Sequence, residues 1–355
     1  MTCRTQNGST FRSPRPAKSP ERLWIPAALL WMCLLMIGTT CPAKEFMDDY
    51  NLGLGPLSLR STSPGQSLRL TQPSIIPGQI KPGWGFQIGT STSNVWLNHP
   101  EILLDFEIFE THMAASYGFN KRFGIGVFFD QRIYYGGILD GSIEEFHDLF
   151  GLGQNGRDEW PQYETHIIHR DKHGNTIVHE DDVGSLLNNN GLGMVLHYVI
   201  TFGGNWIPAV GATAMMRYGL EGPEGLGKPL DLGIGLGLSK RFTKRWYTYC
   251  HLGYTHYGQT EYDTLMIEFE ENLFSGMAAI AWHLKPNFSI LAQYQVHEGA
   301  VINFGTFSEP AHEVTFGFKW LMAQGGVLEF GMIENFIIFD NSSDFGLHLG
   351  YEYSF

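Results

Sequence analysis

The sequence is short of charge, of cysteine and of long apolar runs, and each shortage excludes a class of protein. Only 17% of its 355 residues are charged, and the net charge of −13 argues against nucleic-acid binding. Past the N-terminal region no run reaches about eighteen apolar residues, so transmembrane helices are excluded. The chain also lacks a Gly-x-Ser-x-Gly elbow and a phosphate-binding Gly-Lys-Ser/Thr loop, so no catalytic motif is found.

Glycine and aromatic residues are abundant instead. The chain has 43 glycines, 25 phenylalanines, 15 tyrosines and 9 tryptophans. This composition is typical of many short strands with aromatic faces rather than of packed helices.

The N-terminal region has the layout of a secretory signal peptide. Basic residues precede an apolar run from Leu23 to Ile37 that is too short to span a bilayer comfortably. Cys41 and Ala43 then form a small-x-small cleavage site, so we expect residues 1–43 to be a cleaved signal peptide. A lipoprotein attached through Cys41 is the alternative, although the lipobox pattern is missing. Cleavage leaves Cys250 as the only cysteine, and no internal disulfide can then form.

The C-terminal stretch alternates strictly between two kinds of side chain. Every second residue from Phe345 to Phe355 is apolar or aromatic, whereas His348, Glu352 and the glycines point the other way. The pattern predicts a strand with one lipid-compatible face, because a soluble edge strand would leave the aromatic row exposed. The stretch resembles the last strand of bacterial outer-membrane barrels. That resemblance implies an outer-membrane location and recognition of the strand ending in Phe355 by the barrel-assembly machinery.

The same two-residue period recurs along the chain. Between Val314 and Trp320 the aromatic residues lie on one face, and Glu313 and Lys319 lie on the other. Such strands suit lipid outside and water inside, so we predict an all-β fold: a single antiparallel transmembrane β-barrel of about twelve strands. The predicted strands are 84–96, 102–117, 123–135, 191–201, 209–220, 230–239, 246–257, 274–282, 289–297, 313–320, 327–334 and 345–355.

The connections support this count. Short turns such as 120–122 and 285–287 alternate with longer loops such as 258–272 and 298–311, as periplasmic turns and external loops do in such barrels. The even strand number puts both termini on the periplasmic side. The second strand is the least regular, and its acids Asp105, Glu107 and Glu110 indicate a bulge or an extension beyond the membrane.

Two segments do not fit into strands. Residues 44–83 are rich in proline and glycine and precede the barrel of residues 84–355, so they are either a periplasmic tail or a plug in the lumen. Residues 136–190 are far too long for a plain external loop, and we expect structure there. A short amphipathic helix is predicted within this loop, capped by Ser142. It either forms a structural lid or contributes to a site at the barrel mouth, for which the candidates are Asp140, Glu144, His147, Asp148 and Arg157.

Histidines and acids gather further along this loop. His166, His169, His173 and His179 lie beside Glu180–Asp182, and alternation on both sides of a turn predicts a hairpin above the membrane. Because spacing alone does not make these side chains converge, a solvated hairpin is favoured and no metal site is assigned, with weak adventitious binding of a divalent ion as the alternative.

Charged side chains are also expected inside the barrel. They either line a water-filled channel or pair with one another and close it. The candidate lumenal residues are Asp130, Arg132, His197, Arg217, His251, His297, Glu313, Lys319 and Glu329.

Three segments of the chain resemble one particular family. The runs GGILDGSIEEFHDLFGLGQNGRD and DNSSDFGLHLGYEYSF, together with Ser-Asn-Val-Trp96, resemble an uncharacterised family of Gram-negative outer-membrane barrels. That family is known only as a domain of unknown function, number three-one-eight-seven. The resemblance covers most of the chain and implies a fold and a location, but it implies no activity and no site residue.

We therefore expect a monomeric outer-membrane barrel, surrounded by lipid, that passes or binds small polar solutes as porins do, with the loop of residues 136–190 gating its mouth. No cofactor is expected. The alternatives are a surface enzyme acting on lipid or lipopolysaccharide, and a closed structural or adhesive barrel. Ser342, Ser343 and His348 lie near the rim of the last strand, but His348 is predicted to face the lumen, whereas a lipid hydrolase must present its nucleophile and base to the membrane.

Overall fold

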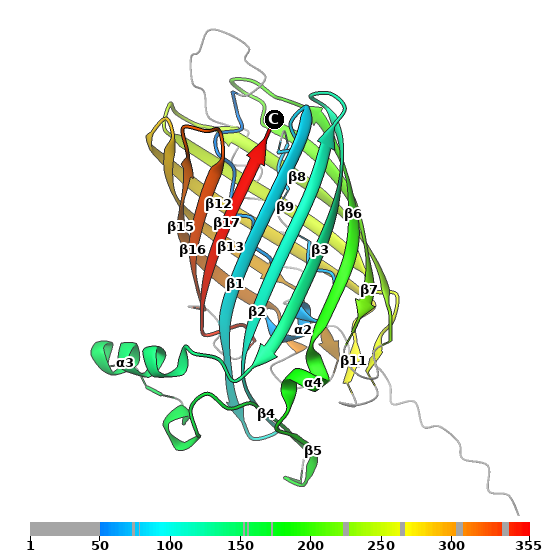
Figure 1. Ribbon diagram of the computed structural model, residues 1–355, viewed down its shortest axis with the longest axis vertical. Helices are drawn as coiled ribbons and strands as arrows, with labels where there is room; N and C mark the ends of the chain where they lie inside the picture. The colour runs from blue at the N-terminus through cyan, green and yellow to red at the C-terminus, as the bar shows by residue number, and fades with distance from the viewer. Residues whose placement is uncertain are drawn as a thin grey trace, which may run out of the picture.

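Antiparallel strands form a closed, twelve-stranded barrel in the computed structural model of this chain (Figure 1). Consecutive barrel strands pair with each other, and β1 (Gly83–His99) pairs with β17 (Phe345–Ser354) to close the sheet. The others are β2 (Ile102–Gly118), β3 (Phe123–Tyr135), β6 (Asn189–Thr201), β7 (Ala209–Glu221), β8 (Leu230–Arg241), β9 (Trp246–His256), β12 (Asn272–Lys285), β13 (Phe288–His297), β15 (Ala311–Leu321) and β16 (Val327–Glu334). The predicted all-β barrel is confirmed.

The structure describes residues 50–72, 75–77, 79–151, 153–154, 156–171, 173–222, 227–262, 267–302, 308–335 and 341–355. The expected signal peptide, residues 1–43, lies outside them. None of the helices in this part of the chain is long and apolar enough to cross a membrane.

The outer wall of the barrel is apolar and exposed. On β8 the side chains of Leu232, Ile234 and Leu236 are 47%, 60% and 38% exposed, whereas Asp231 and Ser239, on the opposite face, are fully buried. A continuous row of exposed apolar side chains would be unfavourable in water, but it is stable in contact with the hydrocarbon of a membrane. On β2 the exposed apolar row ends at Phe109, so the part of β2 before it extends beyond the membrane.

The C-terminal residue completes the seam of the barrel. The backbone N–H and C=O of Phe355 exchange hydrogen bonds of 2.9 and 3.0 Å with Trp84, and its ring stacks on Phe86 at 6.0 Å. This end carries the C-terminus and the short turns, and we call it the periplasmic end (Figure 1).

The loop end carries the remaining elements. They are α3 (Asp140–Phe150), the 3-10 turn η2 (Arg157–Glu159), β4 (His166–Arg170), β5 (Thr176–Glu180), α4 (Val183–Leu187) and a small sheet of β10 (Glu261–Tyr262), β11 (Ile267–Phe269) and β14 (Val301–Ile302). β1 and β2 pair without a register shift from end to end, so β2 has an extension rather than a bulge. β4 pairs with residues 102–105 of this extension.

The predicted cap of α3 is wrong. The helix begins at Asp140, so Ser142 lies inside it, and Leu139 occupies the N-cap position without a side-chain cap. The carboxylate of Glu107 on β2 instead accepts hydrogen bonds from the N–H groups of Ile138 and Leu139, at 2.9 and 2.5 Å. In Figure 1, α3 lies off to one side of the loop end and does not cover the mouth of the barrel.

Residues 50–72, 75–77 and 79–80, which we call the plug segment, lie inside the barrel. Asn51 binds three carbonyls of the periplasmic turn between β6 and β7. The chain then runs to the loop end, where α2 (Pro64–Ser67) lies and the amide of Gln66 donates to the carbonyl of Glu298 at 2.7 Å. It returns to the periplasmic end, where Pro82 bridges to Gly118. Its side chains form much of the lumenal core, with Leu57, Leu59 and Leu70 at most 1% exposed.

Candidate functional site

The interior of the barrel is charged and tightly packed. Every lumenal residue predicted from the sequence is buried, and none is more than 5% exposed. The barrel strands position them, because alternate side chains of each strand point inward. Their partners come largely from the plug segment.

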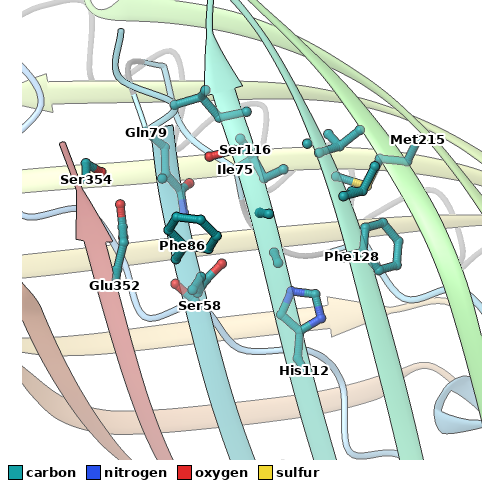
Figure 2. A pocket seen from close by; sticks show the side chains of 18 residues that line it. Ser58, Ile75, Gln79, Phe86, His112, Ser116, Phe128, Met215, Glu352 and Ser354 are labelled. Carbon is teal, nitrogen blue, oxygen red and sulfur yellow. The ribbon is translucent and has the colours of Figure 1, made fainter. Parts of the chain in front are cut away.

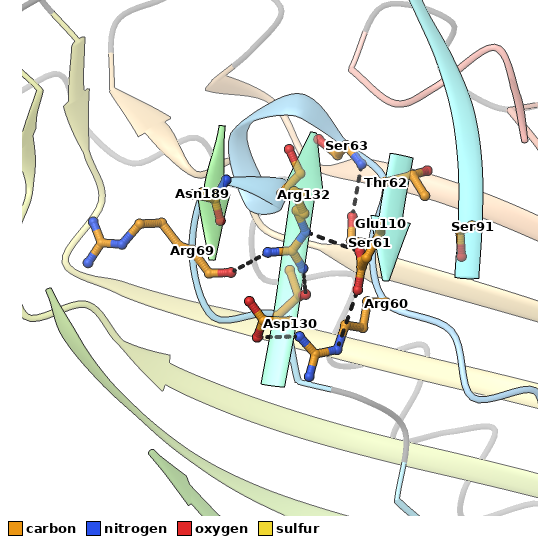
Figure 3. A network of polar contacts seen from close by, with 12 residues as sticks. Arg60, Ser61, Thr62, Ser63, Arg69, Ser91, Glu110, Asp130, Arg132 and Asn189 are labelled. Atoms are coloured by element: carbon orange, nitrogen blue, oxygen red, sulfur yellow. Dashed lines mark hydrogen bonds and ion pairs between the residues drawn. The ribbon is translucent and has the colours of Figure 1, made fainter. Parts of the chain in front are cut away.

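Asp130 on β3 is the centre of a buried ion-pair network (Figure 3). It accepts from Arg60 of the plug segment at 2.9 Å and from Arg217 of β7 at 2.6 Å. Beside it, Arg132 donates to Glu110 of β2 at 3.1 Å. Within this cluster each buried charge therefore has a partner of opposite sign, the arrangement that makes buried charges tolerable.

A second contact holds the returning half of the plug segment. Arg69 pairs with Asp231 of β8 at 2.6 Å, with both side chains fully buried. Asp231 also accepts from the backbone N–H of Leu70 at 3.1 Å. On the outgoing half, Glu313 of β15 accepts from the N–H and the hydroxyl of Thr62, at 2.7 and 2.6 Å.

A third contact lies on β15 and β16. Glu329 pairs with Lys319 at 2.9 Å and contacts His348 at 3.1 Å. Both charged groups also hold the backbone of the plug segment, because Lys319 donates to the carbonyl of Pro56 and Glu329 accepts from the N–H of Ser58. The predicted lumenal carboxylates are thus anchors for the plug segment.

The three predicted lumenal histidines take no part in these ion pairs. His197, His251 and His297 are buried, and Nε2 of each has no hydrogen-bond partner among the described residues. They come from β6, β9 and β13 and do not form a common cluster with the carboxylates.

The plug-segment cations were missed by the sequence analysis. A signal for them exists, since Arg60 and Arg69 are the only charged residues between positions 50 and 80. Two cations in an otherwise neutral stretch, placed before a barrel with inward-facing acids, indicate a segment that pairs with that interior.

A small cavity separates part of the plug segment from the wall. The cavity has a volume of about 80 Å³ and lies against the β17–β1–β2–β3 wall (Figure 2). Ser58 and Gln79 line it from the plug segment, and His112 and Glu352 line it from the barrel. It has room for a few water molecules.

The candidate site residues of the external loop fall into two groups: those in a buried ion-pair contact and those further along α3. Arg157 pairs with Asp140 at 3.3 Å and with Asp344 at 2.6 Å, and its guanidinium lies 5.3 Å from the ring centre of Trp96. These buried contacts tie the loop to β1 and to the start of β17. The structure does not bring the other candidates into this contact, because Glu144, His147 and Asp148 lie further along α3.

The predicted hairpin forms as β4 and β5 and brings three of its polar residues together. His166, His179 and Asp181 place one ligand atom each within 4.8 Å of one another. His173 lies in the turn, and Lys172 beside it is outside the described residues.

A closed barrel with an apolar outer wall and charged interior defines a transmembrane β-barrel of the outer-membrane type. The chain belongs to the family described as "Protein of unknown function (DUF3187)", whose sequence profile matches residues 31–355. The resemblance noted from the sequence is confirmed. No curated protein sequence matches the chain.

Solved structures of similar shape are bacterial outer-membrane channels and porins. An outer membrane channel from Pseudomonas putida F1 has a TM-score of 0.49 at 11% identity, covering 79% of this chain and 100% of its own. The KdgM porin in complex with oligogalacturonate has a TM-score of 0.40 at 10% identity, covering 76% and 99%. The CymD monoaromatic hydrocarbon channel has a TM-score of 0.40 at 13% identity, covering 88% and 99%. At these scores the fold assignment rests on the strand pairing of this chain itself.

Proposed function

We propose that this protein is a porin-like outer-membrane channel for small polar solutes whose lumen is closed by the plug segment. The observation that carries the proposal is the chemistry of the contact between plug segment and wall. Arg60, Arg69 and Thr62 meet Asp130, Asp231 and Glu313. If the segment moves out, both sides of each contact become hydrated, so the lost pairing is largely replaced by solvation.

The inner wall of the barrel that would then line the open lumen favours polar solutes. It carries acids and bases close together, for example Asp130 on β3 and Arg217 on β7, the two strands that flank β6, at 2.6 Å. A water-filled lumen of mixed charge suits small polar or zwitterionic solutes and disfavours hydrocarbons. The proposal assigns no catalytic step to the barrel and no gating role to α3.

We also propose how the protein reaches the outer membrane. Residues 1–43 direct export and are removed, and the assembly machinery recognises the strand that ends in Phe355. The barrel closes within one chain through β1 and β17, which supports a monomer.

The test is to lock the plug segment reversibly. The hydroxyl oxygens of Thr62 and Ser343 are 2.5 Å apart, so Thr62→Cys with Ser343→Cys places two thiols within disulfide reach. The native Cys250 is buried and serves as an unchanged background. The purified barrel is reconstituted in planar bilayers, and conductance is recorded before and after reduction, with each single cysteine variant as control.

We expect the oxidised double variant to conduct less than either single variant and to recover when dithiothreitol is added. Equal conductance in the oxidised and reduced states contradicts a gating role for the plug segment. If the wild type and an Arg60→Gln variant both fail to conduct at either polarity, the barrel is a closed structural one.

A further inference from the structure

The hairpin of β4 and β5 lies outside the membrane and takes no part in closing the barrel. Its pairing places Ile167 opposite Glu180 and Ile168 opposite His179. The same register brings His166 opposite Asp181, just past the end of β5. Side chains on alternate residues share a face, so His166, His179 and Asp181 project from one side of the hairpin.

Their ligand atoms converge on a single point. Nδ1 of His166 lies 2.8 Å from Oδ1 of Asp181, and Nε2 of His179 lies 3.1 Å from the same oxygen. All three atoms lie within 4.8 Å of one another. Two imidazole nitrogens aimed at one carboxylate oxygen is the spacing that ligands of one small cation adopt.

His166 is oriented by groups outside this cluster. Its side chain is only 12% exposed, and its ring lies 5.1 Å from the ring of Trp160. The other ring nitrogen, Nε2, is buried, has no hydrogen-bond partner in the part of the chain that the structure describes, and lies 3.6 Å from a carboxylate oxygen of Glu164. In metal sites the second ring nitrogen of a ligating histidine usually donates to a carboxylate, and Glu164 is the carboxylate near this position.

We propose that His166, His179 and Asp181 bind one zinc ion on the external face of the protein. Two imidazoles and one carboxylate match the preferences of zinc, with the fourth position of a tetrahedron open to water or to a solute. Calcium and magnesium are disfavoured, because they require mostly oxygen ligands. Trp160 shields one side of the site from solvent.

Zinc titration of the untagged, purified barrel in detergent micelles, followed by calorimetry after chelator treatment, tests the site. We expect the His166→Ala, His179→Ala and Asp181→Asn variants each to bind zinc at least about tenfold more weakly than the wild type. The matched control is His173→Ala, which removes an exposed histidine from the turn of the same hairpin and should leave the affinity unchanged. Heat-modifiable migration in gels verifies that every variant is a folded barrel.

Three outcomes overturn the proposal. One is equal zinc affinity in the wild type and all three ligand variants. Another is an equal loss in His173→Ala, which indicates unspecific binding to surface histidines. The third is displacement of zinc by calcium at equal concentration, which indicates a carboxylate site. None of these outcomes affects the channel proposal, which rests on the plug segment.

Discussion

Both charged residues of the plug segment are buried and paired, whereas most of those described in the external loop, residues 136–190, are exposed or half-buried, with Arg157 and Asp140 as buried exceptions; β2 contacts both regions. Glu110 of β2 faces the plug segment and pairs with Arg132, whereas Glu107, beyond the end of the apolar row, holds the start of α3. In the lumen, cations and carboxylates are matched by direct contact. In the loop, side chains such as Asp148 and His179 remain exposed. A charged side chain that is buried away from water needs a partner of opposite charge. A charged side chain that is exposed is solvated and can exchange its partners.

The largest effect should come from removing a charge at the centre of the lumen. Asp130→Ala leaves Arg60 and Arg217 buried without their shared carboxylate, and we expect a loss of about 3–5 kcal/mol in the free energy of unfolding. Denaturant unfolding in micelles measures it. Asp148→Ala on α3 is the control, with an expected change within about 0.5 kcal/mol. Similar losses in both variants would break the contrast between the two regions.

Zinc should stabilise the external side only. At a zinc concentration 100 times the dissociation constant, mass action allows up to about 2.7 kcal/mol of added stability for the bound element. Hydrogen exchange should therefore slow in β4 and β5 and stay unchanged in the plug segment. Slowing in both regions would mean that zinc acts on the whole barrel.

The attachment of the loop through Arg157 should matter less than Asp130 does. Arg157→Gln removes two ion pairs, but the side chain of Asp344 is 19% exposed and becomes solvated. We expect about 1–2 kcal/mol of local destabilisation, seen as faster proteolysis within residues 136–190. The exposed Glu145→Gln serves as control, and an equally fast cleavage there would remove the assigned role of Arg157.

The smallest effect concerns pH. Burial raises the pKa of Glu107 above its ordinary value of 4.5, so the folded protein holds this proton more tightly than the unfolded chain does. The stabilising contribution is complete below about pH 4.5 and is lost as the pH rises through the folded pKa, at roughly 1.4 kcal/mol per pKa unit. The ratio of loop proteolysis in the wild type to that in Glu107→Gln should increase with pH. A constant ratio would contradict this.

Periodicity made the barrel predictable, because a two-residue period needs no knowledge of distant contacts. The position of the plug segment was not predictable in this way, since its proline and glycine residues follow no period. Its partners are remote in sequence: Arg60 and Asp130 are 70 residues apart, and Arg69 and Asp231 are 162 residues apart. Ser142 failed as a cap for the same reason, because Glu107 from another element binds the N–H groups before the helix. Likewise, the convergence of His166 and Asp181 depends on the hairpin register, which spacing alone does not specify.

The two ends of the plug segment lie at the same mouth of the barrel. Asn51 binds the turn between β6 and β7, and Pro82 lies beside Gly118 at the end of β2. The segment therefore enters and leaves the lumen at the same mouth. It does not leave the barrel through the other mouth. Under the proposed function, the segment would leave and return without a free end crossing the lumen and without opening the seam between β1 and β17. The proposal therefore separates the closure of the barrel wall from the filling of its lumen, and it predicts that an inserted barrel exchanges its closed and open states repeatedly.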